Sequence, residues 1–177
     1  LEAPWGRAQL VFIVDQARLA APPKSMAALL DYAKDNIGRV TYPEPPNFHG
    51  TTFLKQVLWE TTRYPDWLTE PYSEERFKPV TLPMWEYLDA LHPNLWRNGR
   101  EFPDSAEVMM DLFSDGILDI ALSFNPNDAS QRILDGRFAP SVRTYVHEMG
   151  TVGNTHFLAI PFNAQSRDAA LVWINLL

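Results

Sequence analysis

The sequence contains no cysteine, which excludes disulfide frameworks, zinc–thiolate sites, iron–sulfur clusters and cysteine nucleophiles. It also lacks a basic excess, because 15 lysines and arginines stand against 22 aspartates and glutamates, a net charge of −7. A nucleic-acid groove needs a basic stripe, so no nucleic-acid partner is expected. No apolar run approaches the about 18 residues of a membrane span, so the chain is not expected to be membrane-spanning. Its 177 residues, 46% of them hydrophobic, suit one folded domain.

Motifs of well-known catalytic and nucleotide-binding sites are missing as well. There is no phosphate-binding G-x-x-x-x-G-K-[ST], no dinucleotide-binding G-x-G-x-x-G and no nucleophile elbow G-x-S-x-G. The four histidines, His49, His92, His147 and His156, lack the spacing of metal ligands. We therefore predict no catalytic residue, no metal and no cofactor. An α/β enzyme that uses His147, His156 or Asp119 remains an alternative.

Short apolar segments alternate with amphipathic ones along the chain. Residues 8–15 form a continuous apolar run that is typical of a buried strand. The expected strands cover residues 8–15, 39–42, 117–123, 142–148 and 155–160. The expected helices cover 26–37 and 51–62, lie around 84–95, and follow residues 105, 125 and 166, whereas 63–80 is expected to be irregular. This order predicts an α/β fold with a mostly parallel sheet flanked by helices.

Local signals mark where several helices begin and how the chain ends. Ser25 suits an N-cap, residues 104–107 have the form of a capping box, and Asn125 with Pro126 reads as a cap followed by a first helical proline. The final segment has a helical apolar face without a terminating glycine, formed by Ala170, Trp173, Ile174 and Leu177. We infer that the sequence is a piece of a longer protein.

Three loops carry polar or aromatic groups that suit ligand binding. They are residues 42–52, 123–127 and 150–156. In an open α/β sheet, ligands bind beyond the carboxyl ends of the strands, beside helix N-termini. Ordinary turn and capping chemistry explains each loop by itself, whereas the three loops together on one edge favour a binding site.

Several of these stretches resemble the periplasmic solute-binding proteins of ABC transporters, in particular the two-lobed iron/thiamine/polyamine-type branch. The similar stretches are residues 4–12, 22–30, 116–121, 155–164 and 168–177. The resemblance implies one α/β lobe of a type II periplasmic-binding-protein fold over residues 1–177. It also implies that residues 1–8 and 155–177 are crossover or hinge segments toward an absent first lobe.

The same resemblance implies a function without catalysis. The protein is expected to be periplasmic or otherwise extracytoplasmic, to capture a small-molecule solute by hinge closure, and to deliver it to the membrane permease of an ABC transporter. The ligand contacts expected from this lobe are Thr51, Phe124, Asn125 and Asn154, with Trp5 and Thr155 near the hinge. The effector-sensing domain of a transcription regulator, which shares this lobe architecture, is a second alternative.

Overall fold

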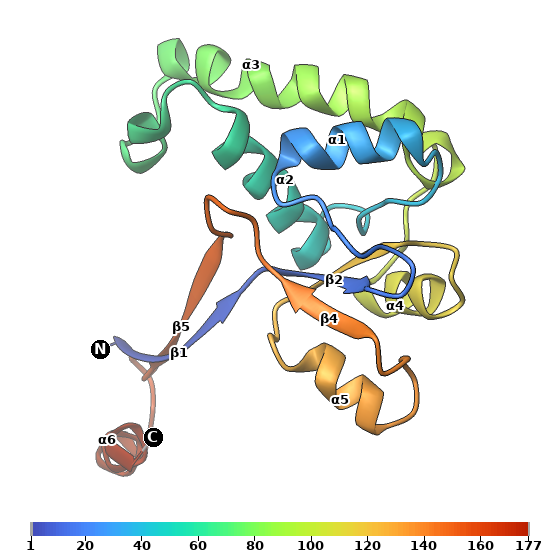
Figure 1. Ribbon diagram of the computed structural model, residues 1–177. Helices are drawn as coiled ribbons and strands as arrows, with labels where there is room; N and C mark the ends of the chain where they lie inside the picture. The colour runs from blue at the N-terminus through green and yellow to red at the C-terminus, as the bar shows by residue number, and fades with distance from the viewer. Residues whose placement is uncertain (1, 177) are drawn as a thin grey trace. The chain divides into compact units, whose positions relative to one another are not determined.

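Two units make up the chain, and the computed structural model describes residues 2–176 (Figure 1). The central unit is Leu10–Val152, and the terminal unit joins the described parts of Leu1–Gln9 and Gly153–Leu177. Leu1 and Leu177 lie outside the described residues. Among the helices of residues 2–176, none is long and apolar enough to cross a membrane.

The central unit is built around a three-stranded sheet in the order β3-β2-β4. The strands are β2 (Val11–Asp15), β3 (Ile120–Ser123) and β4 (Val142–Tyr145), and β2 pairs antiparallel with both neighbours. The expected mostly parallel sheet is therefore wrong in strand direction, although the mixed helix-and-strand lobe is confirmed. β3 and β4 do run in the same direction, but β2 lies between them and runs against both. An alternation of strands and helices predicts a parallel sheet only if the parallel strands are next to each other in the sheet. Here β2 lies between β3 and β4, so the two parallel strands are not paired.

The segment expected to be a strand at 39–42 belongs to neither sheet; Arg39 is half-buried at a bend, and residues 40–42 are buried without regular secondary structure. Its carbonyl groups accept hydrogen bonds from loops instead: Arg39 from the Asp119 N–H, and Val40 from the Trp96 N–H, both at 2.9 Å. Val40 and Tyr42 are almost fully buried. The β-branched, apolar composition therefore predicted burial correctly and strand pairing wrongly.

Helices cover the sheet of the central unit on both sides. They are α1 (Met26–Asp35), α2 (Phe48–Thr61), α3 (Glu74–Leu91), α4 (Ala106–Ser114) and α5 (Asp128–Leu134), with 3-10 turns at Pro65–Thr69, His92–Asn94 and Trp96–Gly99. In the view of Figure 1, α1, α2 and α3 pack together above the sheet and α5 lies below it. The expected cap Ser25 is confirmed, because its Oγ accepts the Ala28 N–H. The helix expected behind the capping box 104–107 is present as α4, but its N-cap is Ser105, whose Oγ accepts the Val108 N–H, rather than Asp104, the first residue of the box.

α3 occupies part of the segment that was expected to be irregular. It begins at Glu74 and continues through Pro79 and Pro83. Each proline removes a backbone donor from the helix, a cost that discouraged a helical prediction. The buried side chains of Val80 and Met84 offset that cost by packing into the core.

One apolar core lies between the sheet and these helices. Its largest fully buried side chains include Phe12, Ile13, Met26, Leu29, Phe53, Leu91, Met109 and Phe113. Phe53 of α2 stacks on Tyr42 with ring centroids 4.5 Å apart, which packs α2 against the segment 39–42. This packing holds the N-terminal turn of α2 in place.

The terminal unit contains a two-stranded antiparallel sheet and one helix. β1 (Glu2–Gln9) pairs with β5 (Gly153–Ala159), and α6 (Arg167–Leu176) follows. No described residue of α6 is buried, so Trp173 is 66% exposed and Leu176 is 74% exposed. The expected final helix is present over its described residues, and its apolar face is open.

Candidate functional site

Two of the connecting segments of the central unit, residues 123–127 and 146–152, lie at the same end of the sheet strands. Ser123 at the end of β3 pairs with Val11 at the start of β2, and Tyr145 at the end of β4 pairs with Phe12. The chain therefore enters β2 and leaves β3 and β4 at the same edge. We call residues 123–127, residues 146–152 and the exposed side of α2 the connection edge.

Phe124 is part of a cluster of three rings at the connection edge. Its ring centroid lies 4.5 Å from that of Phe48 and 5.1 Å from that of His49, both in the first turn of α2. Phe124 is half-buried, whereas Phe48 is 49% exposed. Thr51 follows Phe48 by three residues and therefore lies on the same side of α2. Phe124 thus contacts the first turn of α2, the turn that ends at Thr51.

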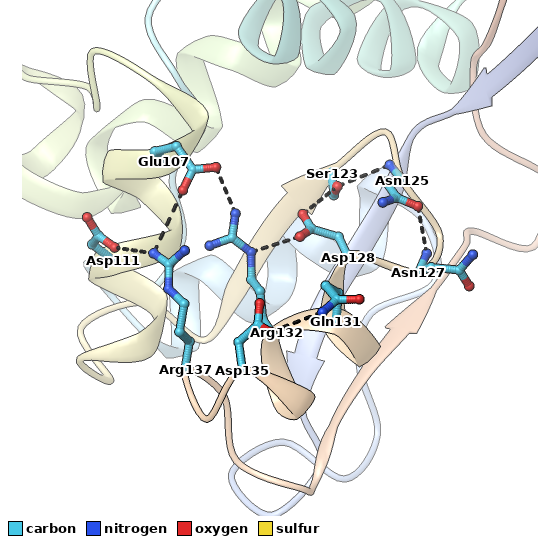
Figure 2. A network of polar contacts seen from close by, with 10 residues as sticks. All are labelled: Glu107, Asp111, Ser123, Asn125, Asn127, Asp128, Gln131, Arg132, Asp135 and Arg137. Carbon is cyan, nitrogen blue, oxygen red and sulfur yellow. Dashed lines mark hydrogen bonds and ion pairs between the residues drawn. The ribbon is translucent and has the colours of Figure 1, made fainter.

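Asn125 lies in a loop that is held from both directions, as Figure 2 shows. Its backbone N–H donates to Ser123 Oγ at 3.1 Å, and its side-chain Oδ1 accepts the Asn127 N–H at 3.0 Å. α5 begins at Asp128 with Asn127 as its N-cap, so the expectation that Asn125 caps this helix is wrong. The turn closed by Asn125 Oδ1 occupies the residues where that helical turn was expected. The exposed Nδ2 of Asn125 has no partner in the described part of the chain and can donate to a solute.

A series of hydrogen bonds and ion pairs connects this loop to α5 and α4 (Figure 2). Ser123 Oγ donates to Asp128 at 2.8 Å, and Arg132 donates to Asp128 at 2.8 Å and to Glu107 at 2.7 Å. Arg132 is 8% exposed, so its guanidinium group is largely shielded from water. Burial lowers the pKa of His49, and the charges of Asp128 and Glu107 offset part of that effect. His49 therefore presents a neutral ring at neutral pH.

A second surface of the connection edge was missed by the sequence analysis. Trp59 of α2 lines a cavity of about 260 Å³ together with Met149, Gly150, Thr151 and Val152. Trp59 is 39% exposed and Met149 is 64% exposed. The signal that could have found Trp59 is its spacing, because it lies eight residues after Thr51 and so on the same face of the helix.

The other three predicted contacts lie in the terminal unit. Trp5 of β1 is 57% exposed, and its ring meets that of His156 edge-on at 6.4 Å. In β5, Asn154 pairs with Ala8 and Thr155 with Arg7. Asn154 and Thr155 are consecutive in a strand and therefore point to opposite faces of the sheet. The six predicted residues accordingly fall into two groups, one in each unit.

Of the residues of the enzyme alternative, Asp119 and His147 lie in two separate groups of polar contacts in the central unit, and His156 belongs to the terminal unit. Asp119 accepts hydrogen bonds from Arg39 (2.5 and 2.9 Å) and from Tyr32 (2.7 Å), and His147 is buried against Glu60 at 2.5 Å. Burial raises the pKa of Asp119, but its bonds to Arg39 and Tyr32 outweigh that effect and hold the pKa below its ordinary value. Across residues 2–176, no three histidine, aspartate or glutamate side chains gather in a way that could hold a metal ion.

Comparison with solved structures places the fold among periplasmic binding proteins. The periplasmic binding protein AfuA from Actinobacillus pleuropneumoniae, solved with fructose-6-phosphate, is 16% identical with a TM-score of 0.60, over 98% of this chain and 48% of that one. The substrate-binding protein PotD of a spermidine/putrescine ABC transporter from Streptococcus pneumoniae is 13% identical with a TM-score of 0.65, over 98% and 46%. The chain therefore has the fold of one lobe, about half of such a protein.

Among curated proteins, the chain is similar to Protein YnjB from Escherichia coli strain K12. The two are 46% identical over 176 residues, which is 99% of this chain and 45% of YnjB. The chain thus spans about half the length of the curated relative that it matches. No protein-family profile matches the sequence.

Proposed function

We propose that this chain is part of the extracytoplasmic, periplasmic-type solute-binding component of an ABC importer. The fold supports this proposal, because it matches about half of one protein named as a periplasmic binding protein and of another named as the substrate-binding protein of an ABC transporter. In the proposed role, the protein captures a small solute between two lobes by hinge closure and delivers it to a membrane permease. It does so without catalysis and without a cofactor.

The connection edge is the observation that carries this proposal. It combines the rings of Phe48 and Phe124 with the Nδ2 donor of Asn125, all beside the place where the chain enters and leaves the central unit. Ligand sites of this kind are mostly apolar, with a few polar groups that fix the orientation of the ligand. On this proposal Thr51, Phe124 and Asn125 contact the solute from the central unit.

The terminal unit would supply the connections to a first lobe. We assign residues 1–8 and 155–177 to these crossover segments, and we place Trp5, Asn154 and Thr155 near the hinge. The open apolar face of α6 supports this assignment, because a face that includes Trp173 and Leu176 is normally covered by another part of a protein.

Native mass spectrometry of the longest natural form of the protein, purified without unfolding, tests the proposed function. We expect a co-purified small molecule that is retained in the native spectrum and is lost after Asn125→Ala with Phe124→Ala. The matched control is Gln131→Ala, an exposed residue of α5 whose side chain bonds to Asp135 and lies outside the connection edge as defined above. Turnover of the captured molecule into a product would contradict the proposal, as would retention of the same molecule by the double variant.

A further inference from the structure

Gln56 is fully buried in α2, yet its side chain bonds to the backbone of a distant segment. Its Nε2 donates to the Gly150 carbonyl at 3.0 Å, and its Oε1 accepts the Val152 N–H at 2.7 Å. Gly150 and Val152 are alternate residues, so one side-chain amide pairs with the chain as a neighbouring parallel strand would. Nε2 also donates to Glu60 at 2.8 Å, one helical turn further along.

Glu60 extends the cluster to two further parts of the central unit. Its carboxylate accepts the Met26 N–H at 2.7 Å and contacts His147 Nδ1 at 2.5 Å. Burial raises the pKa of Glu60, but its bonds to His147, Gln56 and Met26 outweigh that effect and lower the pKa, so the group is a carboxylate at neutral pH. Nδ1 of His147 is then the donor. Nε2 of His147 is buried without a partner among the described residues.

The same segment is bound from its other side by the first residue of the central unit. The Leu10 N–H donates to the Val152 carbonyl at 2.9 Å, and Thr151 Oγ1 donates to the Leu10 carbonyl at 2.5 Å. Leu10 and Val152 are the first and last residues of the central unit. Both connections to the terminal unit therefore start from one hydrogen-bonded pair, Leu10 and Val152. The side chain of Gln56 bonds Val152 of that pair to α2.

We propose that Gln56, Glu60 and His147 form a hinge anchor, which holds the two exit points of the central unit and confines bending to the residues just beyond them. This inference rests on the proposed function, because a hinge matters only if the units move. A buried amide and carboxylate cost desolvation that an apolar core avoids. Their benefit is the placement of residues 150–152, because the bonds of Gln56 are directional and end on backbone atoms. Gly153, the first residue beyond Val152, is exposed and begins β5, where it pairs with Gln9 of β1, so on this proposal the two paired strands bend together at the junction with the central unit.

Amide hydrogen exchange of the 177-residue chain tests whether the cluster holds the exit points. Gln56→Met keeps the size of the side chain but removes its bonds to Gly150 and Val152. We expect exchange at Val152 and Leu10 to become about tenfold faster, the effect of losing a hydrogen bond of ordinary net strength. The rest of the core should keep its protection. The matched control is Gln131→Met, which should leave residues 150–152 unchanged because the side-chain amide of Gln131 donates to Asp135 within α5 and is exposed.

A spin-label distance measurement tests whether the anchor restricts bending. The chain has no cysteine, so Asp35→Cys in α1 and Asp168→Cys in α6 provide one label in each unit. We expect the distribution of distances between the labels to be broader in Gln56→Met than in the parent chain. The control Gln131→Met should give the parent distribution.

Three results would overturn the hinge anchor: unchanged exchange at Val152, faster exchange spread evenly through the central unit, or an unchanged distance distribution. If Gln56→Met does not fold, Thr151→Val is measured instead, because it removes the bond to the Leu10 carbonyl from the opposite side of the segment. The expected local increase and the overturning results are the same. Neither measurement uses a solute. The absence of a bound solute would refute the proposed function, whereas the result of the hinge experiments would not depend on it.

Discussion

Replacing Asp119 by asparagine should destabilise the central unit and leave its fold intact. Asp119 lies just before β3 with a side chain that is 9% exposed, and it accepts hydrogen bonds from Arg39 and Tyr32. Asparagine keeps the shape but loses the charge, and its NH₂ group turns a donor toward other donors. This contrast tests whether Asp119 is a structural residue.

The size of the expected loss in unfolding free energy depends on how exposed the hydrogen-bond partners of Asp119 are. A hydrogen bond to a charged group is worth about 1.5–3 kcal/mol net. Arg39 is 36% exposed, so solvent screens its attraction and water can replace the lost partner. We therefore expect Asp119→Asn to lower the free energy of unfolding by about 2 kcal/mol at pH 7, measured by urea denaturation. The exposed Asp115→Asn is the control and should change it by less than about 0.5 kcal/mol.

The pH dependence of this difference gives a second check. The pKa of Asp119 is lower in the folded protein than its ordinary value, because the bonds from Arg39 and Tyr32 outweigh the effect of burial. The contribution is therefore complete above the unfolded pKa of about 4 and is lost as the pH falls through the folded pKa. The two proteins should approach equal stability at lower pH. A difference that is the same at pH 7 and pH 3, or a loss near zero at pH 7, would refute the reasoning.

Three further outcomes are expected. Asn125→Ala should lower the free energy of unfolding by less than about 1 kcal/mol, because the one bond that its Oδ1 accepts, from the Asn127 N–H, closes an exposed turn ahead of α5. The same change should weaken retention of the co-purified solute about tenfold, as measured by native mass spectrometry and thermal unfolding together. Phe53→Ala should cost about 3–5 kcal/mol in urea denaturation, because Phe53 is 1% exposed and stacks on Tyr42. The 177-residue chain should self-associate in sedimentation velocity at high concentration through the open face of α6, and Trp173→Glu should reduce that association.

The candidate site was partly accessible to sequence reasoning. The place of Phe124 and Asn125 directly after a buried strand and before a helix could be predicted, because the order of elements alone puts such residues at the end of a strand, whereas their contact with a solute stays a prediction. Trp59 was not found, because its role depends on which segment lies opposite α2. That segment, Met149–Val152, is more than eighty residues away in sequence.

Local sequence determined those elements whose reasons are local. Ser25 and Ser105 cap their helices because each Oγ reaches a backbone N–H only three residues away. The apolar run of β2 determined burial, since every residue in Val11–Asp15 is buried. Its direction was decided only by the tertiary structure, because a fully apolar strand carries no pattern that selects parallel or antiparallel neighbours.

Tertiary structure also decided the continuity of α3 and the role of Gln56. Pro79 and Pro83 favour breaks in a local reading, and packing against the core outweighs that cost. A glutamine inside an amphipathic helix predicts an exposed residue, whereas Gln56 is fully buried because Gly150 and Val152 satisfy its amide. The physical reason is the same in both cases. The packing of α3 and the burial of the Gln56 amide both depend on contacts with residues that are far away in sequence, and local sequence does not specify those contacts.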